Sequence, residues 1–192
     1  MSEVERMNID NLMAFHSAPT LLGVKCANLI SFDMSECGIS EYLREFSEKL
    51  SESGFCARRL CNCRKRTLVY IYNEKMLSAW LGMPQVRELL TEYGYTGNMT
   101  LSDMLNILSS RISCGNFPHE IGAFLGYPVG DIRGFISNSG KNCLLCGYWK
   151  VYENAETAQR TFDEYDRCRT ILFDRLKTGL NLFQAISKEE NI

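Results

Sequence analysis

The clearest pattern along the chain is the recurrence of apolar side chains at helical spacing. Tyr42, Phe46 and Leu50 follow one another at four-residue intervals before Gly54, and this spacing predicts a helix over residues 39–53. Similar patterns, bounded by Gly, Pro or capping residues, predict the other helices. They are expected from about residue 4 to His16 or Ser17, at 17–23, 74–82 and 84–93, from Thr100 to about 112, at 117–126 and 128–138, over a long segment around 158–176, and at 180–188.

Runs rich in β-branched and aromatic residues predict the strands. Residues 55–61 and 67–73 are two such runs joined by a polar, basic segment, which is typical of a β-hairpin. Shorter runs predict strands at 28–32 and 144–152. Helices outnumber strands and do not alternate with them, so we expect an α+β protein with a small, mainly antiparallel sheet packed against several helices.

An internal similarity bears on domain organisation. Residues 16–32 and 119–135 align without gaps and bring both histidines of the chain, His16 and His119, into register. The length of 192 residues favours a single domain over residues 1–192. The alternative is a chain of two related half-domains at about 1–98 and 99–192.

Composition narrows the classes of protein to consider. Hydrophobic residues make up 45% of the chain and the net charge is −2, which indicates a globular protein and excludes a strongly basic chain that coats nucleic acid. The acidic start lacks the pattern of a signal peptide, and no run approaches the ~18 apolar residues of a membrane span. We therefore expect a cytoplasmic protein without a membrane contact, whose nine cysteines stay reduced.

Two segments carry a resemblance to a known family. FPHEIGAFLGYPVGDIRGFI at 117–136 and CGYWKVY at 146–152, together with FHSAPTLLGVKCANLISF near the start, resemble an uncharacterised family of anaerobic bacteria, known only as a domain of unknown function. The resemblance implies a cytoplasmic protein in iron- or flavodoxin-linked physiology. It supplies no catalytic residues, cofactor or partner.

The first of these segments holds the main ligand-binding candidates. His119 and Glu120 lie at the predicted start of a helix, where free N–H groups favour a carboxylate or a bound anion. His119 either lines a pocket, facing His16 if the halves are related, or is held structurally while Glu120 caps the helix. Lys150 in the second segment is a further candidate. The glycines at 122, 126, 130 and 134 are expected to permit close packing and tight turns.

Cysteine spacing raises a metal or redox alternative. Cys143 and Cys146 form a C-x-x-C pair, but they precede a predicted strand and not a helix N-terminus, which disfavours a thioredoxin-like role. Cys56, Cys61 and Cys63 could complete a metal site, although their spacing matches no familiar zinc or iron–sulfur pattern. We expect no metal.

The predicted hairpin carries a cluster of positive charge. Five basic residues lie between positions 58 and 66 with no acid among them, and they are Arg58, Arg59, Arg64, Lys65 and Arg66. Such a cluster suits phosphate or nucleic acid. The alternative, which we favour, is contact with the acidic helix within residues 36–52.

Together these features predict a binding or accessory protein with an unknown small ligand or protein partner. The alternatives are a cysteine- and histidine-dependent metal or redox enzyme, and a phosphate or nucleic-acid binder acting through the basic hairpin. Binding of nucleic acid is the less expected outcome, because no nucleotide- or RNA-binding motif accompanies the charge.

Overall fold

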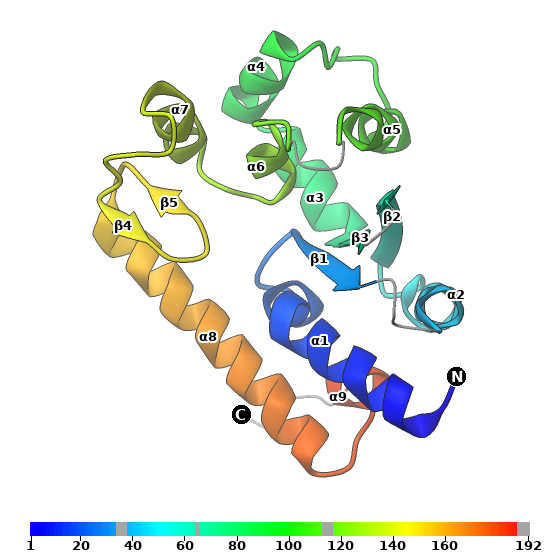
Figure 1. Cartoon of the computed structure of the whole chain (residues 1–192). Helices are drawn as coiled ribbons and strands as arrows, with labels where there is room; N and C mark the ends of the chain where they lie inside the picture. The colour runs from blue at the N-terminus through cyan, green and yellow to red at the C-terminus, as the bar shows by residue number, and fades with distance from the viewer. Residues whose placement is uncertain (34–37, 64–65, 113–116, 188–192) are drawn as a thin grey trace. The chain divides into compact units, whose positions relative to one another are not determined.

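The computed structural model describes residues 1–33, 38–63, 66–112 and 117–187, and within these the chain is an α+β protein (Figure 1). Its chain contacts divide it into two compact units. Unit 1 combines Met1–Glu74 with Tyr165–Ile192, and unit 2 is Lys75–Glu164. Unit 2 is thus inserted between the two segments of unit 1, a division that differs from half-domains meeting near residue 98.

Unit 1 contains a three-stranded antiparallel sheet. Its strands are β1 (Ala27–Asp33), β2 (Phe55–Cys63) and β3 (Arg66–Asn73), in the order β1-β3-β2. The central strand β3 pairs on both sides, and its residues Val69, Tyr70 and Ile71 are fully buried. The predicted hairpin and the predicted antiparallel sheet are therefore confirmed.

The helices of unit 1 enclose its hydrophobic core. They are α1 (Glu3–Leu21), α2 (Ile39–Leu50), α9 (Leu182–Ser187) and the part of α8 (Ala155–Lys177) that follows residue 164. The buried Asp10 carboxylate on α1 joins three of these helices. It accepts hydrogen bonds from the Tyr42 hydroxyl of α2 (2.5 Å) and from the Leu182 backbone N–H of α9 (3.2 Å). Burial raises the pKa of Asp10, while both hydrogen bonds act to lower it.

The first helix corrects one expectation. We predicted a helix that ends near His16 and a second short helix at 17–23, but α1 runs unbroken to Leu21 with Pro19 inside it. Proline has no N–H to donate to the carbonyl four residues earlier, which leaves the Phe15 carbonyl free. Arg169 of α8 donates its Nε–H to that carbonyl at 2.8 Å. A residue distant in sequence thus supplies the hydrogen bond that Pro19 removes.

Unit 2 is built mainly from short helices. They are α3 (Glu74–Leu81, which begins at the boundary), α4 (Pro84–Glu92), α5 (Leu101–Arg111), α6 (Ile121–Phe124) and α7 (Val129–Ser137), followed by the two-residue strands β4 (Leu145–Cys146) and β5 (Lys150–Val151) and the start of α8. The helix expected from Thr100 to about residue 112 is α5, and a capping box precedes it. The Thr100 hydroxyl accepts from the Asp103 N–H at 3.2 Å, and the Asp103 carboxylate accepts from the Thr100 N–H at 3.0 Å.

The strand expected over 144–152 is much shorter than predicted. Only β4 and β5 form, as a minimal antiparallel pair. Immediately after β5, the N–H groups of Tyr152 and Glu153 donate to the Asp131 carboxylate of α7. Because a side chain takes these donors, the segment cannot extend as a strand there.

Among the described residues, no helix combines the length and the apolar character needed to cross a bilayer.

Candidate functional site

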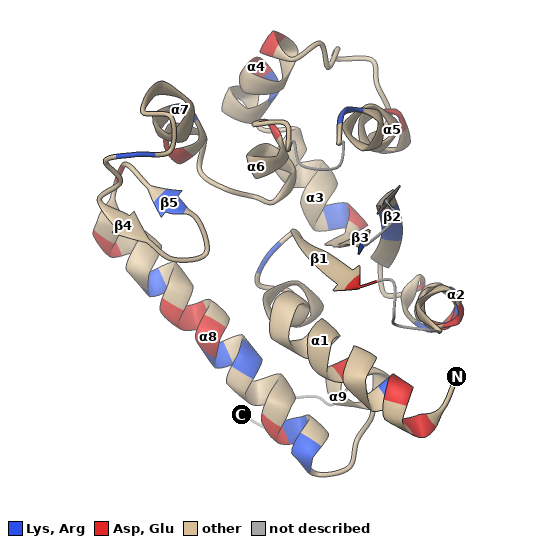
Figure 2. Ribbon diagram, viewed as in Figure 1, with Lys and Arg blue, Asp and Glu red and all other residues tan. Residues whose placement is uncertain are grey.

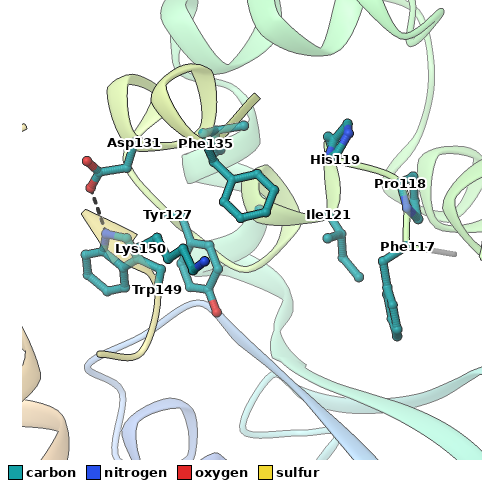
Figure 3. A pocket seen from close by; sticks show the side chains of 11 residues that line it. Phe117, Pro118, His119, Ile121, Tyr127, Asp131, Phe135, Trp149 and Lys150 are labelled. Atoms are coloured by element: carbon teal, nitrogen blue, oxygen red, sulfur yellow. Dashed lines mark hydrogen bonds between the residues drawn. The ribbon is translucent and has the colours of Figure 1, made fainter. Parts of the chain in front are cut away.

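Unit 2 contains a cavity of about 410 Å³ between the 117–120 turn, α6, α7 and the start of β5. Apolar and aromatic side chains form most of its surface, with a histidine, a lysine and an aspartate among them (Figure 3). The lining residues are Phe117, Pro118, His119, Ile121, Gly122, Tyr127, Asp131, Ile132, Phe135, Trp149 and Lys150.

Glycines allow the elements around the cavity to approach closely. A Cβ atom at Gly122 of α6 would lie 2.9 Å from Cγ1 of Ile132 on α7, and one at Gly134 would lie 2.5 Å from Cβ of Tyr152. Gly126, between the two helices, has φ +72°, a conformation that glycine adopts without strain. The expectation that the four-residue glycine spacing serves close packing and turns is confirmed at these positions.

Asp131 fastens the aromatic segment 148–153 to α7. Its buried carboxylate accepts hydrogen bonds from Trp149 Nε1 (2.7 Å), from the Tyr152 N–H (2.7 Å) and from the Glu153 N–H (3.0 Å). Three donors satisfy a carboxylate that burial would otherwise make costly. The role of Asp131 is therefore to position Trp149 and the backbone that follows it.

Stacked aromatic rings make one wall of the cavity rigid. The rings of Tyr127 and Trp149 stack with centroids 5.2 Å apart, and Phe162 of α8 meets Trp149 edge-on at 4.6 Å. The Tyr127 hydroxyl donates to the Tyr148 carbonyl at 3.2 Å, and burial raises the pKa of Tyr127 to about 12. This wall presents flat, apolar surface to anything that enters the cavity.

The polar groups of the cavity gather around Phe135. The Lys150 ammonium and the His119 imidazole each lie 5.9 Å from the centroid of the Phe135 ring. Lys150 Nζ donates to the Gly140 carbonyl at 2.6 Å, which fixes the ammonium at the cavity. In Figure 3, Phe135 lies between the side formed by Trp149 and Lys150 and the side formed by His119 and Phe117. Phe135 and Phe117 are 36% and 50% exposed, so two aromatic rings of this cavity remain open to solvent.

Glu120 behaves differently from the expected helix cap. It is the residue before α6, but its side chain makes no capping hydrogen bond. The carboxylate is fully buried and forms an ion pair with Nε of Arg111 at 2.7 Å. The reason is that the first N–H groups of α6 already donate to backbone carbonyls of residues 118–120, so none is left for a side-chain cap, whereas Arg111 supplies a full opposite charge. Glu120 therefore links α5 to the 117–120 turn and is absent from the cavity lining.

His16 lies in unit 1, on α1, and His119 lies in unit 2. The His16 ring is half-buried and meets the Phe15 ring edge-on at 4.9 Å. Burial, followed by the positive charge of Arg169, lowers the pKa of His16. The suggestion that the two histidines face one another stays a prediction.

The candidate metal-binding cysteines are divided between the units. Cys56 and Cys61 are half-buried on β2 of unit 1, whereas Cys143 and the exposed Cys146 belong to unit 2. The side chain of Cys63 lies outside the described residues. Within the described part of the chain, no three His, Cys, Asp or Glu side chains gather as metal ligands would.

The basic hairpin makes contacts within unit 1. Arg59 donates to Ser40 Oγ of α2 at 2.8 Å, and Arg66 lies 3.9 Å from the Asp33 carboxylate of β1. Arg58 is half-buried opposite Tyr70 of β3. Arg64 and Lys65 lie outside the described residues.

Figure 2 shows that acidic and basic residues are interspersed along α8, so charge of one sign does not dominate that helix.

Sequence reasoning named His119 and Lys150 but missed most of the cavity wall. Aromatic residues on a predicted strand, such as Tyr148 and Trp149, are most often core, so the sequence alone did not place Trp149 at a cavity. The contribution of Phe117, Phe135 and Asp131 depends on the packing of α7 against residues 149–153, which no local pattern specifies. The α7 segment contains two charged residues, Asp131 and Arg133, and nothing in the sequence indicates that Asp131 is the buried one.

Comparison with known proteins identifies a family to which the chain is similar. The model of a family described as "Protein of unknown function (DUF3793)" matches residues 13–186. No curated protein and no solved structure matches the chain.

Proposed function

We propose that this protein, which belongs to the DUF3793 family of proteins of unknown function, is a binding protein. Its ligand is a small aromatic molecule that binds in the cavity of unit 2. The observation that carries the proposal is the cavity of about 410 Å³. Stacked aromatic rings form one of its walls, and the rings of Phe117 and Phe135 in its lining are exposed to solvent. Cavities of roughly 300–1,000 Å³ with mostly apolar walls and few polar groups are typical of small-molecule sites.

Three features support a ligand with a flat ring. The Tyr127–Trp149 stack offers a planar face, and Phe135 offers a second ring close to the solvent. Asp131 holds Trp149 in place, so the wall is organised before a ligand arrives, which lowers the entropic cost of binding. The exposed rings would lose contact with water when a ligand covers them, which favours binding.

The proposal is tested with 2-naphthol, a neutral aromatic probe, on the full chain labelled with ¹⁵N at tryptophan. The chain has two tryptophans, and the Trp80→Phe variant assigns their indole signals. We expect 2-naphthol to shift the Trp149 signal saturably. Phe135→Ala should weaken binding about tenfold, since one buried aromatic contact contributes on the order of 1.5 kcal/mol or more.

Leu144→Ala is the matched control, because Leu144 is 66% exposed, lies near β4 and is not part of the cavity lining. It should bind the probe as the wild type does. The absence of a saturable Trp149 shift at millimolar probe, or equal binding by Phe135→Ala, would contradict the proposal.

A cytoplasmic location and a role in anaerobic, iron- or flavodoxin-linked physiology remain predictions from the sequence. The nucleic-acid alternative receives less support, because Arg59 and Arg66 already have partners inside unit 1.

A further inference from the structure

The polar groups of the cavity offer a ligand hydrogen-bond donors but few hydrogen-bond acceptors. Both oxygens of the Asp131 carboxylate are engaged, Oδ2 by the Trp149 indole and Oδ1 by two backbone N–H groups. The Lys150 ammonium has three N–H donors. Among the described residues it donates one of them, to the Gly140 carbonyl, so two remain for a ligand.

Lys150 places its N–H donors close to the aromatic surface of the cavity. Its Nζ lies 5.9 Å from the Phe135 centroid, and the neighbouring residue Trp149 carries the stacked wall. A planar ligand lying against these rings would bring a substituent at its edge within reach of the ammonium. On the other side of Phe135, the exposed His119 ring offers a second N–H group.

The charge balance favours an anionic substituent over a cationic one. Asp131 carries the negative charge of the lining, but it is 3% exposed and surrounded by three donors, which disperse its charge. Lys150 is less buried and keeps unused N–H groups. A carboxylate accepts such charge-assisted hydrogen bonds well, whereas an ammonium would meet Lys150 as a like charge.

From this geometry we infer that the ligand is a planar aromatic carboxylate whose anionic group pairs with Lys150 while its ring lies against Phe135 and Trp149. The inference rests on the proposed function and adds the chemical class of the ligand to it.

The test compares 2-naphthoate with the neutral 2-naphthamide by titration calorimetry on the full chain. We expect the wild type to bind 2-naphthoate at least tenfold more tightly, the effect of one charge-assisted hydrogen bond. Lys150→Met should remove this preference and leave 2-naphthamide binding within about threefold. Lys150→Arg should restore a large part of it, which separates charge from a structural role of the side chain.

Lys141→Met is the matched control. Lys141 is an exposed lysine in the loop between α7 and β4 that does not line the cavity, so its replacement should keep the preference for naphthoate. Equal affinity of the wild type for the two probes, or a preference that survives Lys150→Met, would overturn the inference while leaving the proposed function intact. Failure of both probes to bind would contradict the proposed function itself.

Discussion

Lys25 is a buried lysine, and burial disfavours the charged form of its side chain. Its side chain is 4% exposed in unit 1, and its ammonium lies 5.7 Å from the centroid of the Tyr165 ring. Burial lowers the pKa of Lys25 to about 8, from an ordinary value of 10.5. The neighbouring Cys26 thiol is affected in the opposite direction, because burial raises its pKa to about 11.

These shifts predict a pH dependence of unit 1 stability. Between about pH 8 and 10.5 the unfolded chain holds a proton on Lys25 that the folded chain lacks, so the Lys25 contribution to stability increases with pH. The slope approaches ~1.4 kcal/mol per pH unit. Above pH 9, Cys26 acts in the opposite sense, since its thiol remains protonated only in the folded state.

The measurement is the free energy of unfolding in urea between pH 7.5 and 9. We expect the wild type to gain stability relative to Lys25→Met over this range, while Lys141→Met, which removes an exposed lysine, follows the wild type. Parallel curves for the wild type and Lys25→Met would contradict the prediction.

Gly134 is the residue on which the closest packing around the cavity depends. A methyl group there would lie 2.5 Å from Cβ of Tyr152, an atom next to the backbone that cannot rotate away. Although alanine favours helices by about 1 kcal/mol over glycine, overpacking costs roughly 1–3 kcal/mol. We therefore expect Gly134→Ala to destabilise unit 2 and to weaken 2-naphthol binding.

Thermal unfolding and probe titration measure these two effects. Gly97→Ala is the control, because a Cβ atom at Gly97 meets no atom within 4 Å. It should change neither stability nor binding by a measurable amount. A Gly134→Ala variant with unchanged melting temperature and affinity would show that α7 and residues 150–153 can separate without loss.

At the scale of elements, α1 depends on α8 for the completion of its hydrogen bonding. Arg169 donates to the Phe15 carbonyl and lies 4.5 Å from the centre of the Phe15 ring. We expect Arg169→Met to reduce stability by about 1–2 kcal/mol. With Pro19→Ala in place, residue 19 regains an N–H that can donate to the same carbonyl, so Arg169→Met should cost less.

A double-mutant cycle of unfolding free energies checks this dependence. The expected coupling between the two substitutions is about 0.5–1 kcal/mol. Strictly additive changes in the unfolding free energy would contradict the prediction. They would mean that the hydrogen bond from Arg169 to the Phe15 carbonyl does not contribute to stability and that water satisfies this carbonyl instead.

Elements specified by local signals were predicted well from the sequence. The helix at 39–50, the hairpin and the capping box at Thr100 follow from periodicity and capping chemistry within a few residues. The errors occurred where a distant residue supplies or removes a backbone hydrogen bond. Arg169 allows α1 to continue past Pro19, and Asp131 shortens the strand expected at 144–152.

At the scale of the whole molecule, the candidate site was only partly predictable. His119 and Lys150 belong to the segments that carry the family resemblance, and both line the cavity. That Phe117 and Phe135 line the same cavity with exposed rings is a result of tertiary packing, which sequence spacing does not reveal. The division into units has the same origin, because chain segments far apart in sequence share the core of unit 1.

The insertion of unit 2 into unit 1 also affects the order in which the protein can fold during synthesis. The core of unit 1 includes Leu172, Leu182 and Phe183, which leave the ribosome only after all of unit 2. At about 5–20 residues per second, the sheet of unit 1 waits roughly 5 to 20 seconds for them. Unit 2 emerges in one continuous stretch and can complete its cavity first, so the nascent chain exposes the apolar faces of α1 and α2 to chaperones until the segment that follows residue 164 has been made.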